Sequence, residues 1–336
     1  MARVRLVDVA RAAGVHPGTA SRALNPAARD GVSKQTVRRV EQAATTLGYV
    51  ANSMARGLRT SRSMVVTLVV PDITNPLFPP IVRGAENVLS GAGYTLVLTD
   101  TNHDPVTERD QVLAMRGRGV DGFIIATAHL ESATLASLAE DEVPTVLVNR
   151  RTRSASLPFV GADDRHGVKL CVDHLVELGH RRIVHLAGPP TTSTAEDRAD
   201  AFQASVLTHQ LEAETFEADS FTEESGAAVV RKRLEAGARF TAIVAANDLL
   251  AIGALQALGE HGISCPDQVS ITGYNDIDYV SKLTPPLTTV HVPLRREGEL
   301  AAETLLRVIK GQTDSAMQML LPVELMRRGT TGPAPR

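Results

Sequence analysis

The chain has 336 residues, of which 43% are hydrophobic and 22% are charged, a balance typical of a globular protein with two or three domains. No apolar run approaches the roughly twenty residues that a membrane-spanning helix needs, and the N-terminus lacks the apolar stretch of a signal peptide. Two isolated cysteines, Cys171 and Cys265, suit a reducing compartment. We therefore expect a cytoplasmic protein with no membrane partner.

The charges that sum to a net −3 are distributed unevenly along the chain. Residues 1–62 contain eleven Lys and Arg against three Asp and Glu, so this segment carries +8 and the remainder carries −11. A small basic segment gains affinity for DNA by releasing counterions from phosphate groups. A solvated cationic face is the alternative, but it does not explain why the excess of cations over anions ends at Arg62. The acidic remainder would repel DNA.

Three short helices are predicted within the first fifty residues. Small apolar residues at helical spacing over residues 8–13 indicate the first helix, which Gly14 ends. Pro17 begins the second helix, at a position where its missing N–H costs nothing. A third helix is expected between Ser33 as its N-cap and Gly48 at its C-terminus. Two helices joined by a glycine-containing turn are typical of a helix-turn-helix, and a plain helical hairpin is the alternative.

Beyond residue 62, strands and helices alternate. Continuous apolar runs predict strands buried on both faces, at residues 65–70, 95–99, 122–126, 145–149, 182–187, 242–246 and 269–273. Helical patterns lie between them, at residues 77–90, 105–118, 165–178, 195–209, 249–261 and 295–310. This alternation implies parallel sheets, arranged as one barrel or as two open sheets. We favour two sheets, which bind ligands in a cleft at the carboxyl ends of their strands.

Several stretches, in order over roughly residues 4–330, resemble the LacI/GalR family, the relatives of the lactose repressor. They are LVDVARAAGVHPGTASRALN from residue 6, LGYVAN from 47, PDITNPLF from 71, LVELGHRRI from 175, ANDLLAIGAL from 246, and TGYNDID followed by PPLTTV. The resemblance implies an α-helical helix-turn-helix headpiece, a hinge helix and a two-lobed α/β effector domain similar to periplasmic binding proteins. It further implies a homodimer on a near-palindromic double-stranded DNA operator.

The resemblance also implies a division of the chain. We expect a DNA-binding headpiece at residues 1–51 and a hinge helix with its linker at 52–62. The N-lobe of the effector domain is expected at 63–161 plus 292–320, and the C-lobe at 162–291 plus 321–330. Residues 331–336 are expected to form a tail.

Within the headpiece, the resemblance places base-reading positions at Pro17, Gly18 and Arg22. Since Pro17 lacks an N–H and Gly18 lacks a side chain, Arg22 is the residue that can contact guanine in a bidentate manner. Phosphate-contacting positions, which fix the register, fall on Thr19, Ser21, Asn25 and Tyr49. Arg5 stands where relatives often have a capping Thr, so we expect a weaker first cap that Asp8 partly offsets.

Residues 52–59 (NSMARGLR) correspond to the hinge helix of relatives. Asn52 and Ala55 lie in this segment, and Leu58 occupies the place of a leucine that wedges open the central base step in the minor groove. So short a helix, containing Gly57, is marginal alone, and we expect it to fold only with DNA and a partner hinge. A plain linker is the alternative.

The resemblance implies that ten residues line the effector cleft. They are Leu77, Phe78, Asn149, Thr192, Thr194, Arg198, Phe221, Asn247, Asn275 and Leu294. Arg198 stands at the position of the family's ligand-binding arginine, and Phe221 at that of an aromatic that stacks on a sugar or base. Asn247 and Asn275 equally suit the role of strand-end caps. Asp248 is interpreted mainly as the N-terminal charge of the following helix.

Asn149 and Asn275 stand where relatives often have aspartate. Because amides replace two carboxylates, we expect Arg198 to lose negative neighbours in the cleft. An effector with a carboxylate or phosphate, such as a sugar acid, would supply the missing charge, and a neutral sugar or polyol is the alternative. Other carboxylates would restore the balance from nearby, namely Asp72, Asp163 and Asp276.

Together these features predict a transcriptional regulator, a repressor whose DNA binding responds to a small molecule (a sugar, sugar acid or related metabolite). The chain has no phosphate-binding loop or nucleophile elbow, and His174, His180 and Cys171 lie at spacings unlike those of a zinc site. We therefore expect no enzyme, cofactor or metal. An effector-independent architectural DNA-binding protein is the alternative. Residues 327–333 contain no apolar heptads, so we expect a dimer and not a tetramer.

Overall fold

The computed structural model describes residues 4–24, 29–49, 62–312 and 317–335. The chain divides into two compact units, residues 1–63 and residues 64–336, which we call the headpiece and the effector unit. Within the described ranges, no helix has the length and apolar character that a membrane crossing requires. Both cysteines are free thiols.

The headpiece consists of three helices with a core of small residues. They are α1 (Leu6–Ala12), α2 (Pro17–Ala23) and α3 (Lys34–Leu47). The Nδ1 atom of His16 accepts a hydrogen bond from the N–H of Gly18 at 3.1 Å and caps α2. Ser33 caps α3, and Gly48 ends it at a φ of +64°, as predicted. The buried apolar residues are Val9, Ala10, Ala13, Ala20, Ala23, Val37, Val40 and Ala44.

The start of α1 uses the carboxylate of Asp8. Its Oδ2 accepts a hydrogen bond from the backbone N–H of Arg5 at 2.9 Å. The same carboxylate lies in the first turn, where a negative charge interacts favourably with the helix dipole. Asp8 therefore offsets the absence of a capping Thr, as expected.

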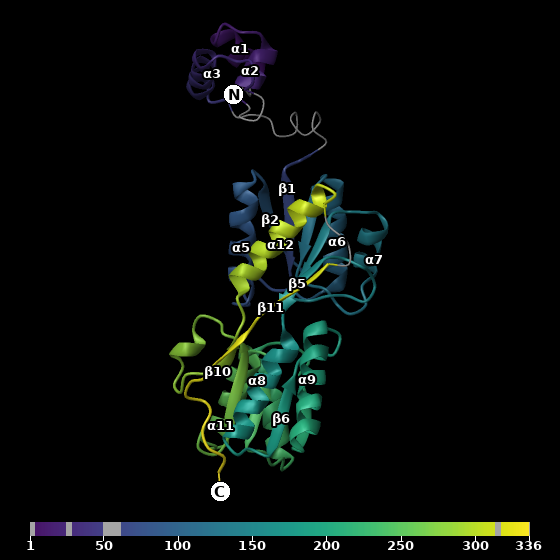
Figure 1. Cartoon of the computed structure of the whole chain (residues 1–336), viewed down its shortest axis with the longest axis vertical. Helices are drawn as coiled ribbons and strands as arrows, with labels where there is room; N and C mark the ends of the chain where they lie inside the picture. Colours follow the sequence, from purple (N-terminus) through teal and green to yellow (C-terminus); the bar gives the residue numbers. More distant parts are fainter. Residues whose placement is uncertain (1–3, 25–28, 50–61, 313–316, 336) are drawn as a thin grey trace. The chain divides into compact units, whose positions relative to one another are not determined.

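The effector unit contains two six-stranded sheets, one in each lobe (Figure 1). In the N-lobe the order is β11-β5-β4-β3-β1-β2, with β1 (Val65–Val70), β2 (Thr95–Asp100), β3 (Gly122–Ile125), β4 (Thr145–Val148), β5 (Phe159–Ala162) and β11 (Gln318–Leu321). In the C-lobe the order is β12-β10-β9-β8-β6-β7, with β6 (Arg182–Ala187), β7 (Glu212–Glu217), β8 (Ala242–Ala245), β9 (Ser270–Asn275), β10 (Thr288–His291) and β12 (Glu324–Met326).

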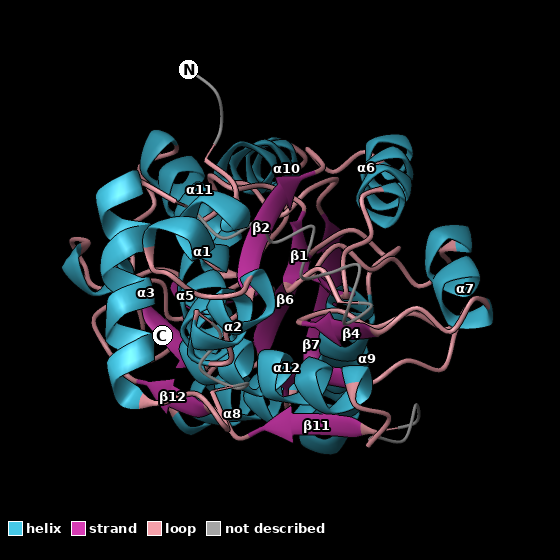
Figure 2. Cartoon of the chain, turned by 90° about the horizontal axis from the view of Figure 1, so that it is seen from above, coloured by secondary structure: helices cyan, strands magenta, loops and turns pink. Residues whose placement is uncertain are grey.

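Helices lie on both sides of the strands (Figure 2). The N-lobe carries α5 (Phe78–Gly91), α6 (Pro105–Gly117), α7 (Ala133–Glu140) and α12 (Leu294–Ile309). The C-lobe carries α8 (Asp164–Glu177), α9 (Ser193–His209), α10 (Glu223–Glu235), α11 (Asp248–Glu260) and the short 3₁₀ helix η2 (Val280–Lys282). The predicted two-sheet, parallel architecture is confirmed, with one antiparallel pairing between β10 and β12 among the described strands.

The chain passes between the two sheets three times. It crosses after β5 into α8, after β10 into α12, and again between β11 and β12. In the N-lobe, α5 and α12 cross at backbone contact, because a Cβ on Gly84 would lie 2.1 Å from the carbonyl oxygen of Arg295. A Cβ on Gly298 would likewise lie 2.0 Å from the carbonyl oxygen of Ile81. These two glycines therefore allow the helices to pack closely.

Candidate functional site

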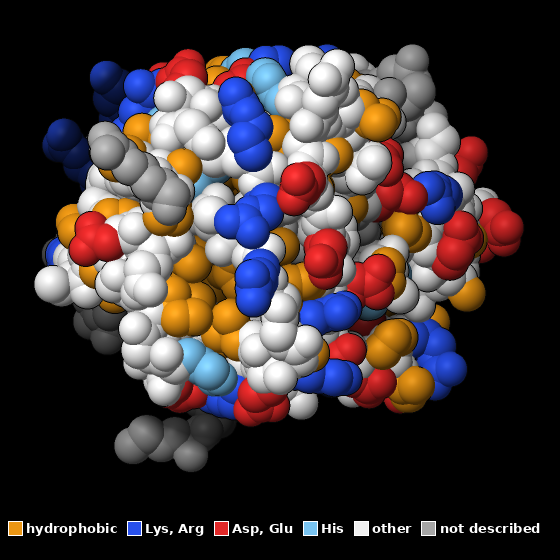
Figure 3. All heavy atoms as spheres, turned by 90° about the horizontal axis from the view of Figure 1, so that it is seen from below, with side chains coloured by type: hydrophobic (Ala, Val, Ile, Leu, Met, Phe, Trp, Pro, Cys, Tyr) orange, Lys and Arg blue, Asp and Glu red, His pale blue; other side chains and the backbone are white. Residues whose placement is uncertain are grey.

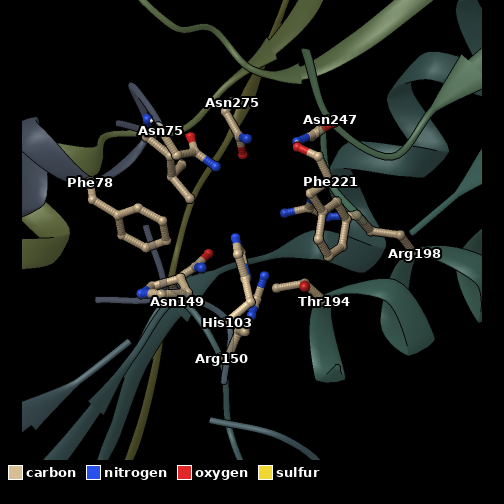
Figure 4. Close-up of a pocket in the computed structure, with 12 residues that line it drawn as sticks. Asn75, Phe78, His103, Asn149, Arg150, Thr194, Arg198, Phe221, Asn247 and Asn275 are labelled. Carbon is tan, nitrogen blue, oxygen red and sulfur yellow. Dashed lines mark hydrogen bonds between the residues drawn. The ribbon is translucent and has the colours of Figure 1, made fainter. Parts of the chain in front are cut away.

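A cavity between the lobes lies at the carboxyl ends of strands from both sheets (Figure 4). Its atom-free space, including the open mouth, is about 340 Å³. Phe78 and Phe221 lie on opposite sides, and four asparagine amides surround the space between them. The lining residues are Pro71, Asn75, Leu77, Phe78, His103, Asn149, Arg150, Thr194, Arg198, Phe221, Asn247 and Asn275.

Eight of the ten residues expected in the cleft line this cavity, and Thr192 and Leu294 do not. The hydroxyl of Thr192 caps α9 by accepting from the N–H of Ala195 at 3.4 Å, and it donates to the carbonyl of Pro189 at 3.0 Å. Leu294 is buried in the apolar core at the start of α12. Both side chains have partners within the fold, and their expected contact with an effector stays a prediction.

Four lining residues were not expected: Pro71, Asn75, His103 and Arg150. His103 follows β2, and Arg150 comes two residues after β4. Both therefore occupy the edge where parallel sheets bind ligands. That rule indicates this edge of the sheet, but no local pattern marks the two residues themselves.

Asn149 and Asn275 both have positive φ angles. Their φ angles are +63° and +112°, in the region that non-glycine residues adopt rarely and asparagine adopts more readily than most. Aspartate and asparagine both tolerate this conformation, so the backbone is compatible with either residue at the two positions.

Phe221 is held in place from two directions. A Cβ on Gly188 would lie 2.2 Å from the aromatic ring, so the ring occupies the space that glycine leaves. The amide of Asn247 donates to the carbonyl of Phe221 at 3.3 Å and accepts from the N–H of Leu250 at 2.8 Å. Asn247 therefore caps the helix after β8, as one of its two interpretations predicted, and fixes the aromatic wall as well.

Arg198 does not lose its negative neighbours, and the expectation that it does is wrong. Asp164, in the first turn of α8, accepts from its Nε at 2.9 Å and lies 2.8 Å from its Nη2. The third guanidinium nitrogen, Nη1, donates to the carbonyl of Ala246, and the guanidinium carbon lies 3.8 Å from the ring centroid of Tyr274. Burial is the largest single influence and disfavours the charge of Arg198, but Asp164, Tyr274 and Asp248 together outweigh it and raise the pKa of Arg198. Arg198 is therefore a fixed member of a buried ion pair.

The carboxylates named as possible replacements have other partners. Asp163 caps α8 by accepting from the N–H of His166 at 3.0 Å. Asp276 pairs with Arg328 at 2.7 Å. Asp72 accepts from the N–H of Thr74 at 2.7 Å in its own turn.

Asp248 does more than place a charge at the start of α11. It is fully buried, with one oxygen accepting from the hydroxyl of Thr289 at 2.5 Å and the other from the N–H of Ile277 at 2.9 Å. Burial raises its pKa to about 7. Asp248 therefore ties β10 to the loop after β9, the strand that ends in Asn275.

In the headpiece, α2 divides into a buried face and an exposed face. Ala20 and Ala23 enter the core, whereas Gly18 and Arg22 are exposed. Pro17, Thr19 and Ser21 are half-buried, and Tyr49 packs against the headpiece core. Four expected DNA contacts, Asn25, Asn52, Ala55 and Leu58, lie outside the described residues.

The cations of the headpiece are mostly unneutralised. In its described part, ion pairs join Arg29 to Glu41 and Arg11 to Asp8. The side chains of the remaining exposed cations there have no ion-pair partner, namely Arg5, Arg22, Lys34, Arg38 and Arg39. The face shown in Figure 3, by contrast, carries Asp and Glu beside Lys and Arg. The basic headpiece is therefore the part suited to a polyanion.

Known families and proteins match both units. Residues 5–52 match the family described as bacterial regulatory proteins, lacI family, and residues 172–331 match the periplasmic binding protein-like domain. The chain is 36% identical to an uncharacterized HTH-type transcriptional regulator in the aml 5' region of Streptomyces limosus, over 97% of this chain and 94% of that protein. It is 33% identical to the ribose operon repressor of Halalkalibacterium halodurans, over 96% of each chain.

Among solved structures, the lac repressor dimer bound to operator and the anti-inducer ONPF has a TM-score of 0.89 at 28% identity. That match covers 98% of this chain and 100% of the other. The chain belongs to the lacI family of bacterial transcriptional regulators. The predicted family, fold and regulatory, non-enzymatic class are confirmed.

Proposed function

We propose that this protein is a repressor that binds a near-palindromic operator as a homodimer in the cytoplasm, and that a sugar-type effector in the cleft sets its operator affinity. The observation that carries the proposal is the amide-lined cavity between Phe78 and Phe221. Asparagine amides both donate to and accept from hydroxyl groups, and aromatic faces pack against the C–H surface of a sugar ring. The names and ligands of the ribose operon repressor and the lac repressor support this class of effector.

On the DNA side, we propose that Arg22 reads guanine through a bidentate contact. Its exposure on α2 supports this role. Thr19, Ser21, Asn25 and Tyr49 are proposed to contact phosphates, and Asn52, Ala55 and Leu58 to act at the minor groove, with Leu58 as the wedge. These assignments rest on the family resemblance.

An apolar groove on the N-lobe supports the homodimer. It lies along α5 and β2, which is an edge strand of its sheet, and it includes Ile73, Pro79, Val82 and Leu98. Ile73 is half exposed. A second copy that covered this groove would remove apolar surface from water.

The test combines operator selection with ligand binding. Purified protein selects its operator from random DNA, and operator affinity is then measured with and without each sugar that raises the melting temperature. We expect at least one such ligand to change operator affinity, and the operator to change that ligand's affinity by the same factor. Ligands that stabilise the protein and leave operator affinity unchanged would favour an architectural DNA-binding protein.

A matched pair of variants tests whether the ligand binds in this cavity. Thr194→Val removes a buried hydroxyl that lines the cavity, and Thr208→Val removes an exposed hydroxyl on the same helix. Loss of one hydrogen bond at Thr194 should raise the effector Kd about 3- to 10-fold, since such a bond contributes roughly 0.5–1.5 kcal/mol. Operator affinity without effector should not change. Equal effects of the two variants would place the ligand elsewhere.

A further inference from the structure

Arg150 is a buried cation at the floor of the cleft. Its side chain is 6% exposed and reaches toward the space between Phe78 and Phe221, with its guanidinium carbon 5.3 Å from the ring centroid of Phe221 (Figure 4). Burial, followed by the charge of Arg198, lowers its pKa to about 10. This pKa is still well above neutral, so Arg150 carries a full positive charge inside the protein.

Nothing in the described chain neutralises this charge. No carboxylate in residues 62–312 or 317–335 lies within ion-pair distance of Arg150, and its Nε has no hydrogen-bond partner there. An unpaired buried charge costs several kcal/mol, so proteins seldom retain one without a partner. Arg198 also lines the cleft, but its buried charge is neutralised by an ion pair with Asp164.

The acidic side chains in this region form no ion pair with Arg150. Asp72 and Asp100, which lie near His103, accept hydrogen bonds from backbone N–H groups. Asp104 and Glu108 line an adjoining cavity together with Arg150, but the Asp104 carboxylate caps α6 through the N–H groups of Val106 and Thr107. Burial raises the pKa of Glu108, which disfavours its charged form. Burial likewise raises the pKa of Glu297 to about 8, so this side chain is protonated at neutral pH.

Further donors converge on the same place. The adjoining cavity shares Pro71, His103 and Arg150 with the cleft and is also lined by Thr127 and His129. The buried Thr127 hydroxyl lies beside the carboxyl group of Glu108, which is its hydrogen-bonding neighbour. Burial and then the charge of Arg150 lower the pKa of both histidines, so each imidazole is neutral and can donate one N–H. His129 already interacts with the backbone of Thr191, so Arg150 and His103 are the donors that remain for a ligand at this place.

We propose that the effector of this protein carries an anionic group, a carboxylate or a phosphate, which binds the Arg150 guanidinium beside His103. The inference rests on the proposed function of the cleft and specifies the class of effector: a polyhydroxylated acid or phosphate ester, not a neutral sugar. Planar guanidinium groups recognise carboxylate and phosphate oxygens through charge-assisted, often bidentate hydrogen bonds. The remaining amides of the cleft would then bind the hydroxyl groups.

The experiment measures binding of matched probes to the full-length protein at constant ionic strength. The probes are glucose, galactose and ribose, their uronic or aldonic acids, their terminal phosphate esters, and inorganic phosphate. We expect at least one acid or phosphate ester to bind at least 10-fold more tightly than its neutral parent in calorimetry. Whether the carboxylates or the phosphates bind then distinguishes the two sources of charge.

Three variants link this preference to Arg150. Arg150→Gln should lower the affinity for the anionic probe about 10- to 100-fold, and Arg150→Lys should keep part of the preference because it keeps the charge. Arg231→Gln, at an exposed ion pair with Glu260 on the C-lobe, is the control and should change nothing. Because Arg150→Gln removes an unpaired buried charge, the ligand-free variant should melt at the same temperature as the parent or higher, which verifies that it folds.

Several results would overturn the inference. These are equal or tighter binding of the neutral parent, unchanged affinity in Arg150→Gln, and no anionic probe raising the melting temperature beyond sodium chloride at equal ionic strength. Operator binding in the same samples separates this inference from the proposed function. A protein whose operator binding responds only to neutral sugars retains the proposed function and refutes the anionic effector. A protein that binds no operator, or whose operator binding ignores every bound probe, refutes the proposed function itself.

Discussion

The headpiece and the effector unit use polar residues in opposite ways. In the headpiece, a core of small apolar residues supports exposed groups such as Arg22, which no described side chain holds in place. In the effector unit the polar groups that shape the cleft lie inside the protein, where Arg150 and Arg198 are 6% and 3% exposed. A substitution on the headpiece surface should therefore alter DNA binding alone. A substitution in the effector unit should alter stability and ligand binding together.

The largest effect should come from breaking the buried ion pair. Arg198→Met leaves Asp164 buried without its partner, and such changes cost about 3–5 kcal/mol of unfolding free energy. Urea denaturation of the full-length protein measures the loss. Arg231→Met removes an exposed partner of Glu260 and should cost less than about 1 kcal/mol. A loss at Arg198 as small as that at Arg231 would show that the interior tolerates an unpaired charge.

The second-largest effect is expected from a substitution where α5 and α12 cross at backbone contact. Gly298→Ala would place a methyl group 2.0 Å from the carbonyl oxygen of Ile81, and such overpacking costs about 1–3 kcal/mol or more. Gly91→Ala, at the end of α5, is the matched control because no atom lies within 4 Å of the added carbon. Thermal unfolding of both variants compares them. Equal melting temperatures would mean that the two helices can separate at no cost.

An effect of about 1–3 kcal/mol per half-site is expected for Arg22→Ala, in operator affinity and not in stability. The exposed side chain contributes nothing to the headpiece core, so the melting temperature should stay the same. Selection of binding sites from random DNA should show relaxed preference at one symmetric base pair. Arg38→Ala, exposed on α3, is the control for the simple loss of a positive charge. Unchanged sequence preference in the Arg22 variant would remove this residue from base reading.

The smallest effect concerns pH and the buried Glu297. Burial raises its pKa to about 8 from an ordinary value of 4.5, so in this range the folded protein holds a proton that the unfolded chain has released. Its contribution to stability therefore falls as the pH rises from about 4.5 to 8, by about 1 kcal/mol between pH 6 and pH 7. Glu297→Gln removes this dependence, and the exposed Glu224→Gln is the control. Parallel stability curves of wild type and Glu297→Gln would contradict the prediction.

The sequence predicted some parts of the fold well because their signals are local. Val65–Val70 and Arg182–Ala187 are continuous apolar runs in central strands, and both were predicted with the bounds that the structure has. β7 (Glu212–Glu217) was missed because it is an edge strand with mostly exposed side chains and therefore has no apolar run. The helix caps at Ser33 and Gly48 depend on their own residues and were found.

Residues of the cleft could be predicted only where they stand at a position of the family pattern or at the end of a predicted strand. Phe78 and Phe221 were predicted from the resemblance. His103 and Arg150 were not predicted, because both lie in loops beyond the ends of β2 and β4, where no local pattern marks them. The partner of Arg198 was beyond prediction, because Asp164 lies on another helix and no local pattern joins the two residues.

The three crossings between the sheets restrict how this protein can exchange parts with its relatives. Neither lobe is a contiguous segment, since β11 and β12 return to different sheets near the end of the chain. A gene fragment that ended after β5 would lack α12, which packs against α5. A single recombination event between residues 49 and 64 can therefore attach a new headpiece to an intact effector unit. Operator preference can change in one genetic step, whereas a new effector must be acquired by point substitutions within a unit that is inherited whole.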